Sequence, residues 1–413
     1  MKKIVSAVAL AAVAAGLATA DVKTSINFRR GTNVFNNPNV SKSTVQYGQL
    51  GDVTGTDAFT FKASNEYAGI TLNYNPISKS TGKALWSDGQ GVEYTGYMNL
   101  ADWLQLKGGV HKDGIFYAEQ VKKDTDDTNW SAAGKYAFLY KYGVTTKNST
   151  AYAVDDLTSY QIGGTPFAFA DFKFGVGGGN LLIRGAIANT GKNWLLTGGY
   201  ENKTMATPGL MVAFKNDVIN VNVDVQSISN NDLAAGVFVS PLGLADNALQ
   251  LTAGFSLSTV FDGEKSAVGS VKDNKDGVTF YAIDLGVRYV AGDFHIANRF
   301  NFTGATEEGY VKQGASTASA RTGDANIWDS LFLTFKLNDN WTITGNVQAQ
   351  VATKAAGDDA VIDLSVTPGV MYTVGKGATI TAGLYTSIGD VTGKVADDAV
   401  IGVALPVIFR VKM

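Results

Sequence analysis

Hydrophobic and polar residues alternate with a period of two along most of the chain. The clearest example is a hairpin that runs from Leu331 to Val351 and turns at the polar residues 338–340. Its apolar positions are Leu331, Leu333, Phe335, Leu337, Trp341, Ile343, Val347, Ala349 and Val351. Successive side chains of a strand point to opposite faces, so each strand has one apolar and one polar face. Strands of about ten residues with this pattern suit a tilted crossing of a bilayer.

Similar alternation predicts strands through the rest of the chain. The segments are 22–28, 59–62, 68–74, 92–100, 103–107, 136–142, 167–174, 181–187, 210–214, 219–226, 249–258, 281–289, 294–301, 362–372, 380–388 and 401–411. The register of residues 143–179 is ambiguous from the pattern alone. A transmembrane barrel whose two termini lie on the periplasmic side has an even number of strands, and we expect roughly 16 to 20.

Connection length separates two all-β architectures that share this alternation. In the second half of the chain, short turns at 291–293, 338–340 and 375–377 alternate with long segments at 261–277, 303–326, 352–360 and 389–398. A transmembrane barrel has short periplasmic turns and long external loops, whereas a soluble β-sandwich has no such rhythm. We therefore predict an all-β, antiparallel, up-and-down transmembrane β-barrel, with a secreted sandwich array as the alternative.

The first twenty residues have the pattern of an export signal. Lys2 and Lys3 precede an apolar stretch at 4–16, and Ala18-Thr19-Ala20 offers a small-residue cleavage site. The apolar stretch is shorter than the roughly 20 residues that a spanning helix needs. We expect a cleaved signal peptide at 1–20 and a single barrel domain at 21–413.

Composition supports this interpretation and excludes several classes of partner and chemistry. The chain is 45% hydrophobic and 17% charged, with 47 glycines, 7 prolines and no cysteine. Without cysteine, thiol catalysis, thiolate metal sites and disulfides are impossible. A net charge of -3 predicts no nucleic-acid partner.

The strand faces opposite the apolar residues carry most of the charge, and in a barrel they would line the pore. The candidate pore-lining residues are Lys23, Arg29, Lys62, Glu93, Lys107, Lys141, Arg184, Asp224, Asp284, Arg288, His295, Arg299, Lys336, Asp363 and Arg410. Basic residues outnumber acidic ones in this set, which favours a modest preference for anions. The alternative is that these charges pair with inward-folded loops or are simply solvated.

Three tryptophans directly follow predicted turns, namely Trp103, Trp194 and Trp341. An amphipathic ring in this position is typical of a membrane interface, although packing within a hairpin would place it similarly. We expect these three residues to form part of an interfacial aromatic girdle.

No motif predicts enzymatic chemistry, a cofactor or a metal. The chain has only two histidines, His111 and His295, and neither has a marked catalytic partner. The glycines at 175–179 lack the Lys-Ser/Thr ending of a phosphate loop and fit a glycine-rich turn. The acidic segment at 273–277 fails the calcium-loop pattern. We expect a protein that is not an enzyme.

In its signal segment, hairpins and Asp-Trp turns, the chain resembles bacterial outer-membrane β-barrel porins, and spirochaetal outer-membrane proteins in particular. The resemblance covers the whole of residues 21–413. It implies the outer membrane of a diderm bacterium, contact with outer-membrane lipid, recognition by the barrel-assembly machinery and assembly as a homotrimer. Barrels of this class usually end in Phe or Trp, whereas this chain continues four residues beyond Phe409.

Two functions fit these patterns. The first is a porin, a water-filled channel for passive diffusion of small hydrophilic solutes or ions, since barrels of 16 to 18 strands leave an aqueous lumen. The second is a surface adhesin or ligand-binding protein that uses the long external loops on a barrel scaffold.

Overall fold

The computed structural model describes residues 21–37, 56–74, 92–111, 165–189, 206–228, 232–260, 279–306, 311–313, 321–323, 325–356, 359–393 and 400–413. The expected signal peptide, the expected strand at 136–142, Lys141, Trp194 and the acidic segment at 273–277 lie outside these ranges. No helix in the described ranges is long and apolar enough to cross a membrane.

The described residues form antiparallel strands and one short 3₁₀ helix. The elements are β1 (Asp21–Asn36), β2 (Thr56–Ser64), β3 (Ala68–Tyr74), β4 (Val92–Ala101), β5 (Leu104–His111), β6 (Thr165–Val176), β7 (Gly179–Asn189), β8 (Ala206–Lys215), β9 (Ile219–Ile228), β10 (Asp232–Pro241), η4 (Leu244–Asn247), β11 (Leu249–Val260), β12 (Thr279–Ala291), β13 (Phe294–Ala305), β14 (Val311–Gln313), β15 (Arg321–Gly323), β16 (Ala325–Lys336), β17 (Trp341–Ala356), β18 (Asp359–Gly375), β19 (Ala378–Gly383), β20 (Tyr385–Gly389) and β21 (Val400–Lys412). The all-β prediction is confirmed.

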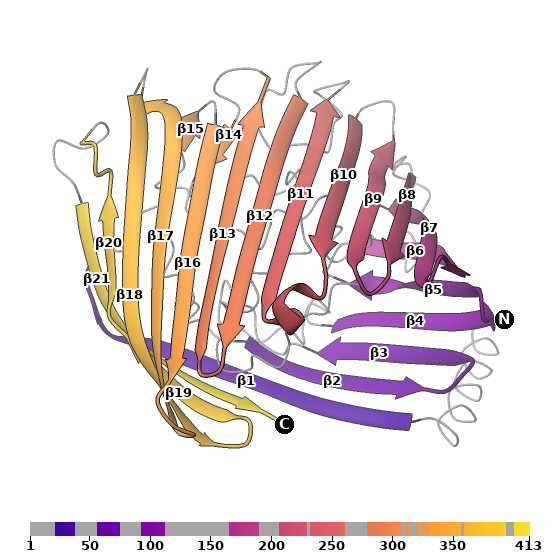
Figure 1. Ribbon diagram of the computed structural model, residues 1–413, viewed down its shortest axis with the longest axis horizontal. Coiled ribbons are helices and arrows are strands. Elements are labelled where there is room, and N and C mark those ends of the chain that lie inside the picture. The colour runs from indigo at the N-terminus through magenta and orange to yellow at the C-terminus, as the bar shows by residue number, and fades with distance from the viewer. Residues whose placement is uncertain are drawn as a thin grey trace.

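Nineteen of these strands form one sheet that closes on itself, because β1 pairs with β2 on one side and with β21 on the other. Figure 1 shows the strands following one another around the barrel, with β1 and β21 meeting beside each other. β19 and β20 both pair with β18 and with β21, so together they occupy one position. The barrel therefore has eighteen strand positions, an even number within the predicted range. β14 and β15 form a separate two-stranded hairpin.

The interruption between β19 and β20 has a chemical cause. The N–H of Leu384 donates to the carbonyl of Pro368 in β18 (2.9 Å), but proline has no N–H to donate in return. On the other side, Pro406 of β21 lies between the residues that pair with Ala382 and Tyr385. Prolines on both neighbouring strands remove donors at the same place, so the ladder breaks there while its register continues.

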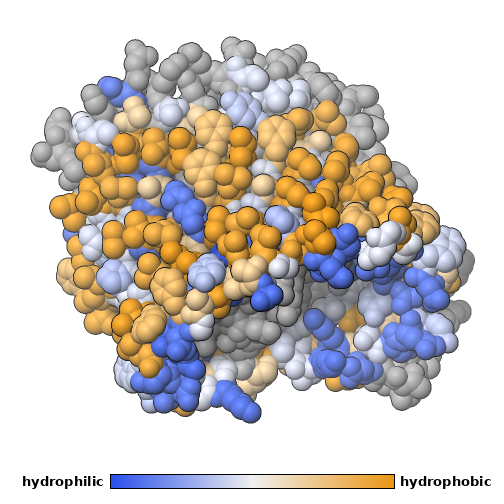
Figure 2. Space-filling view, viewed as in Figure 1, coloured by the Kyte–Doolittle hydropathy of each residue, from blue (hydrophilic) through white to orange (hydrophobic). Residues whose placement is uncertain are grey.

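The strands present an apolar face to the outside, and most inner positions are polar or small, with a few large apolar side chains such as Met211, Phe332 and Met371 buried among them. On β17, Ile343 and Val347 are exposed, whereas Thr344, Asn346 and Gln348 are buried. Figure 2 shows the outer side chains as an apolar band, with hydrophilic residues at the lower edge of the view. This arrangement is the reverse of a soluble protein and matches a barrel that contacts lipid around its circumference.

The short connections agree with the sequence, and one of the long ones does not. The glycine-rich segment forms the β6–β7 turn, where Gly177 and Gly178 have φ of 56° and 74°. Two successive positive φ values are typical of a tight hairpin turn, as predicted for this segment. The predicted long loop at 352–360 is wrong, because β17 ends at Ala356 and β18 begins at Asp359. Small alanine and threonine residues obscured the strand pattern there.

Candidate solute channel

The register of the strands determines which residues share the inner face, because cross-strand partners point to the same side of a sheet. Asp171 pairs with Arg184, Arg184 with Met211 and Met211 with Asp224. The same cross-strand pairing, followed around the barrel, places the other predicted residues on this face. They are Lys23, Arg29, Lys62, Glu93, Lys107, Asp284, Arg288, His295, Arg299, Lys336, Asp363 and Arg410. That this face lines an open channel stays a prediction.

The structure describes only part of the predicted pore-lining set. Only the backbone is described for Arg29, Glu93, Asp224, Asp284 and Arg299, and Lys141 lies outside the described ranges. Side chains are described for the remaining nine, and their environments differ widely. Lys62 is exposed, Lys107, Arg288, His295 and Arg410 are half-buried, and Arg184 and Asp363 are buried.

The middle of the wall formed by β17, β18 and β20 has an inner face of neutral, buried residues, which we call the neutral wall. Its inner residues include Thr344, Asn346, Gln348, Ser365, Thr367 and Ser387, each at most 4% exposed. Asn346 Nδ2 donates to Ser330 Oγ (2.9 Å), and Gln348 Nε2 donates to Asn346 Oδ1 (2.9 Å). The hydroxyls of Thr344, Ser365, Thr367 and Ser387 have no hydrogen-bond partner among the residues that the structure describes.

The wall formed by β21, β1 and β2 carries clustered basic positions instead, and we call it the basic wall. Lys23 is the cross-strand partner of Lys62, and Arg29 is the partner of Arg410. Like charges directly opposite each other destabilise a sheet, so two such pairs on adjacent strands call for an explanation. Lys23 forms an ion pair with Asp21 (2.8 Å) in which both side chains are largely exposed. Lys62 is exposed as well, so both ammonium groups are accessible to water, and Asp21 balances part of their charge.

A buried ion pair ties β6 to β7 on the inner face. Arg184 Nε donates to Asp171 Oδ1 (2.6 Å), and its Nη2 donates to Asp171 Oδ2 (2.8 Å). The two side chains are 1% and 3% exposed. Two parallel bonds between a guanidinium and a carboxylate fix both groups in one plane. Arg184 was predicted from its strand face, but its partner was not, because register cannot be read from one strand.

A second inner-face contact joins β12 to β13 near their short turn. Arg288 Nε donates to His295 Nε2 (2.8 Å), so this nitrogen of the histidine ring acts as an acceptor. The pair therefore requires a neutral histidine in this arrangement. Both side chains are half-buried, and the guanidinium keeps its positive charge.

At the other end of the barrel, Asp363 of β18 holds the end of β20. The backbone N–H of Asp390 donates to Asp363 Oδ1 (2.6 Å), and both residues are buried. Thr392 Oγ donates to Asp390 Oδ1 (2.9 Å) and to the carbonyl of Ala360 (3.1 Å). These bonds anchor the start of the β20–β21 connection on the wall. Within the described ranges, no group of three acidic or histidine side chains could hold a metal ion.

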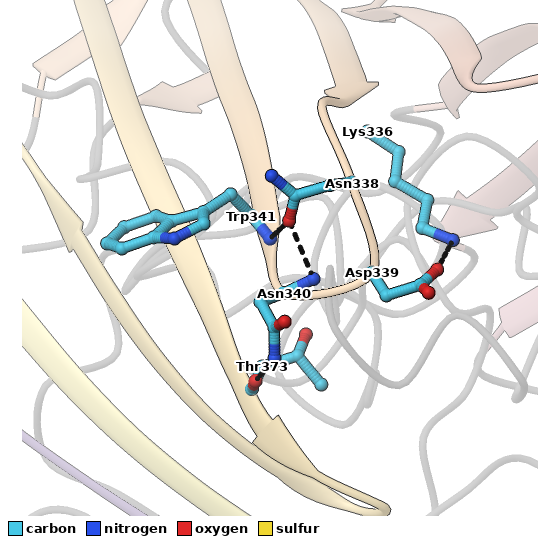
Figure 3. A network of polar contacts seen from close by, with 6 residues as sticks. All are labelled: Lys336, Asn338, Asp339, Asn340, Trp341 and Thr373. Carbon is cyan, nitrogen blue, oxygen red and sulfur yellow. Dashed lines mark hydrogen bonds and ion pairs between the residues drawn. The ribbon is translucent and has the colours of Figure 1, made fainter.

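Three short turns share one construction, in which an asparagine side chain accepts two backbone hydrogen bonds. Asn338 Oδ1 accepts from the N–H groups of Asn340 (2.9 Å) and Trp341 (3.0 Å), as Figure 3 shows. Asn65 and Asn216 form the same pair of bonds in the β2–β3 and β8–β9 turns. These bonds satisfy backbone N–H groups of the turn, where the hydrogen bonds between the two strands have ended.

An acidic residue follows the asparagine in each of these turns. Beside the turn in Figure 3, Lys336 Nζ forms an ion pair with Asp339 Oδ1 (2.9 Å). This hydrogen bond and the positive charge lower the pKa of the exposed Asp339 carboxyl below its usual value. The short-turn end of the barrel thus combines acidic turns with a basic inner face.

Both described tryptophans of the predicted girdle lie at this same end. Trp341 begins β17, is 43% exposed and contacts Tyr372, with ring centroids 4.8 Å apart. Trp103 lies in the β4–β5 turn, is 49% exposed and stacks on Phe172 at 6.2 Å. Their partial exposure beside polar turns suits a membrane interface, and that assignment stays a prediction.

Comparison with solved structures identifies the fold. The chain resembles OccK3 (OpdO) of Pseudomonas aeruginosa with a TM-score of 0.50 and 9% identity, over 97% of each chain. It resembles the outer-membrane protein opdK of Pseudomonas aeruginosa with a TM-score of 0.50 and 9% identity, over 95% of this chain and 99% of that one. No protein-family model and no curated protein sequence matches the chain. At such low identity the likeness shows the fold alone.

The closed sheet, the outward apolar band and these neighbours define the class of protein. The chain is an outer-membrane β-barrel, and barrels of this class lie in the outer membrane of diderm bacteria. Sequence reasoning therefore gave the correct fold class and location.

Proposed function

We propose that the chain is a porin, a passive diffusion channel for small hydrophilic solutes, with a preference for anions. The observation that carries this proposal is the closed barrel of eighteen positions with a polar inner face. Barrels of about eight strands are filled by their own side chains, whereas 16 to 18 strands leave an aqueous lumen. A passive sieve requires only such a lumen and no catalytic group.

The expected preference for anions rests on the basic wall. Lys23 and Lys62 are exposed cross-strand partners, and Arg410 lies opposite the register position of Arg29. Clustered positive charge beside a low-dielectric wall raises the local concentration of anions. The neutral wall contributes no such field, so we assign selectivity to the strands β21, β1 and β2.

The same proposal covers the export of the chain, its insertion into the membrane and its contact with lipid. Residues 1–20 would be removed as a signal peptide, leaving one barrel domain at 21–413. The barrel would contact outer-membrane lipid and would be inserted by the barrel-assembly machinery. Because the chain continues past Phe409, that residue would act as an internal insertion signal. The likeness to spirochaetal outer-membrane proteins is part of this proposal.

Single-channel recording tests the proposal directly. The mature protein is refolded into planar bilayers, and conductance and reversal potential are measured under a KCl gradient. We expect steady openings with a reversal potential on the chloride side. Openings that favour potassium would keep the pore and remove the anion preference.

The absence of openings from protein shown to be inserted would contradict the channel itself. In that case the adhesin alternative would gain support, because residues 112–164 separate the adjacent strands β5 and β6 in the sequence and long insertions often carry recognition. Deleting 115–160 and measuring binding to cells would then test it.

A further inference from the structure

A polar pair interrupts the outer apolar face of the barrel. Figure 2 shows a hydrophilic patch surrounded by the apolar band. Asn298 of β13 and Asp329 of β16 occupy outer-face positions, and Asn298 Nδ2 donates to Asp329 Oδ1 (3.0 Å). The cross-strand partners of Asp329 are Phe300 and Ala349, and those of Asn298 are Val287 and Leu331. The pair therefore lies within the surface that faces lipid.

A carboxylate at this position is unfavourable unless something else contacts it. Charged groups in the hydrocarbon region are rare and mark functional sites or partners. Asn298 satisfies one oxygen of Asp329, and its amide also lies 3.4 Å from the carbonyl of Ser330. No donor from the described residues contacts the second oxygen of Asp329, which is half-buried. Among the described residues, the second oxygen of Asp329 therefore has no hydrogen-bond donor, and no cation lies beside the carboxylate.

The chain carries one basic residue at an outer-face position of its barrel strands within the described ranges. Arg30 of β1 is the cross-strand partner of Phe409, which is 48% exposed in the apolar band. The two residues can be compared by their distance from the short-turn end of their strands. Arg30 lies nine positions from Asp21, where β1 begins. Asp329 lies seven positions from Lys336, where β16 ends. At a rise of about 3.3 Å per residue, their depths along the strands differ by only about 7 Å.

We propose that the outer face around Asp329 docks a second copy of this chain, with Arg30 of that copy supplying the missing cation. β16 and β1 are different parts of the circumference, so the contact is heterologous and repeats around a closed ring. A two-fold contact would instead bring two Asp329 carboxylates together, and like charges repel. Five of the eighteen strand positions separate β16 from β1, roughly 100° of the circumference, which suits a ring of four or five copies better than the expected homotrimer. The proposal is independent of whether the channel conducts.

The surface beside Asp329 suits close approach of another barrel. Its neighbours on β17 are the small outer-face residue Ala349, which is its cross-strand partner, and Val347. Small residues let two surfaces approach closely within a membrane. Arg30 also has an acidic neighbour within its own chain, because Asp57 is the cross-strand partner of Phe28. The experiment must therefore separate pairing within one chain from pairing between copies.

Charge exchange tests the contact in the full mature protein. Molar mass in detergent is measured for the wild type, Asp329→Asn, Arg30→Asn, and the combined Asp329→Arg and Arg30→Asp variant. We expect the wild type to form a ring and each single variant to weaken association at least about tenfold. The combined variant should restore the ring. Asp339→Asn, which removes the same charge from an exposed turn, should leave the ring unchanged.

Cysteine crosslinking tests the geometry, because the chain has no cysteine of its own. Chains carrying only Ile26→Cys are mixed with chains carrying only Leu331→Cys, both at outer-face positions five residues from the short-turn end of their strands, and then oxidised. We expect a mixed dimer band and no band from either chain alone. A monomeric wild type, an unaffected Asp329→Asn variant or bands between identical cysteines would overturn the proposal. Loss of the ring on Asp57→Asn but not on Asp329→Asn would do so too.

Discussion

Two walls of the same barrel use the same alternation for different purposes. On the neutral wall, inner residues such as Ser365 and Ser387 are almost completely buried. On the basic wall, the ion pair of Lys23 and Asp21 has side chains 74% and 66% exposed. A period of two therefore decides which side of the sheet a residue faces but not whether water reaches it. Exposed charge can act on a passing solute, whereas a buried group contributes to stability instead.

The largest expected effect concerns the buried ion pair of β6 and β7. Arg184→Met leaves Asp171 buried without its partner, and we expect a loss of about 3–5 kcal/mol in the free energy of unfolding. Urea unfolding in phospholipid vesicles, followed by tryptophan fluorescence, measures the loss. The exposed pair provides the contrast, since Lys23→Met should cost far less because water screens that ion pair.

A double variant strengthens this test. Asp171→Leu combined with Arg184→Met removes both charges, and it should be considerably more stable than Arg184→Met alone. Equal losses for Arg184→Met and Lys23→Met would show that burial does not distinguish the two regions.

The next effect concerns a close contact between β3 and β4, next to the basic wall. A Cβ atom on Gly69 would lie within 2.8 Å of two ring atoms and the hydroxyl oxygen of Tyr97, its cross-strand partner. Gly69→Ala must displace that ring, and we expect a loss of about 1–3 kcal/mol. Gly185→Ala is the matched control, because a Cβ there meets nothing within 4 Å. A similar loss from both variants would show that the tyrosine contact is unimportant.

The selectivity of the channel for chloride over potassium should change only when charges on the basic wall are changed. Two unit charges about 8 Å apart in water interact by about 0.5 kcal/mol, and salt reduces this further. We expect Lys23→Glu with Lys62→Glu to lower the chloride-to-potassium permeability ratio by about threefold, measured as a shift in reversal potential. Thr344→Val on the neutral wall should leave the ratio unchanged. A shift from Thr344→Val as large as that from the lysines would reject our assignment.

On the neutral wall we expect a smaller effect of opposite sign, namely an increase in the free energy of unfolding. The hydroxyls of Thr367 and Ser387 are buried without hydrogen-bond partners. Because an unsatisfied buried polar group is unfavourable, Thr367→Val and Ser387→Ala should raise the free energy of unfolding by up to about 1 kcal/mol. A clear loss of stability in the same urea assay would mean that these hydroxyls have partners, such as ordered water.

The smallest effect concerns the turn beside Trp341. Lys336 lowers the pKa of Asp339, so the pair stabilises the turn above the ordinary carboxyl pKa. That contribution disappears as the pH falls through the lowered value. Lys336→Ala should return the pKa of Asp339 towards 3.8, as measured by NMR titration of the carboxyl carbon. An unchanged pKa would show that the ion pair does not persist in solution.

The sequence was sufficient for features that depend on neighbouring residues. Strand alternation at Leu331–Lys336 and the paired glycines at 177 and 178 are local signals, and both agree with the structure. The strand ends were less predictable, as the wrong loop at 352–360 shows. The sequence also contained the signal for Asp329, because it lies two residues before Leu331 on the apolar face. The alternation recognised from Leu331 onwards extends back to Asp329, because β16 begins at Ala325.

By itself, the sequence determined the all-β architecture, the two faces of each strand and the membrane class. These features follow from the period-two geometry of a strand and from the preference of apolar side chains for lipid. Only the tertiary structure decided which strands pair at closure, that Asp171 is the partner of Arg184, and which inner residues lose contact with water. Those facts depend on register and curvature, which bring together residues that no local pattern connects.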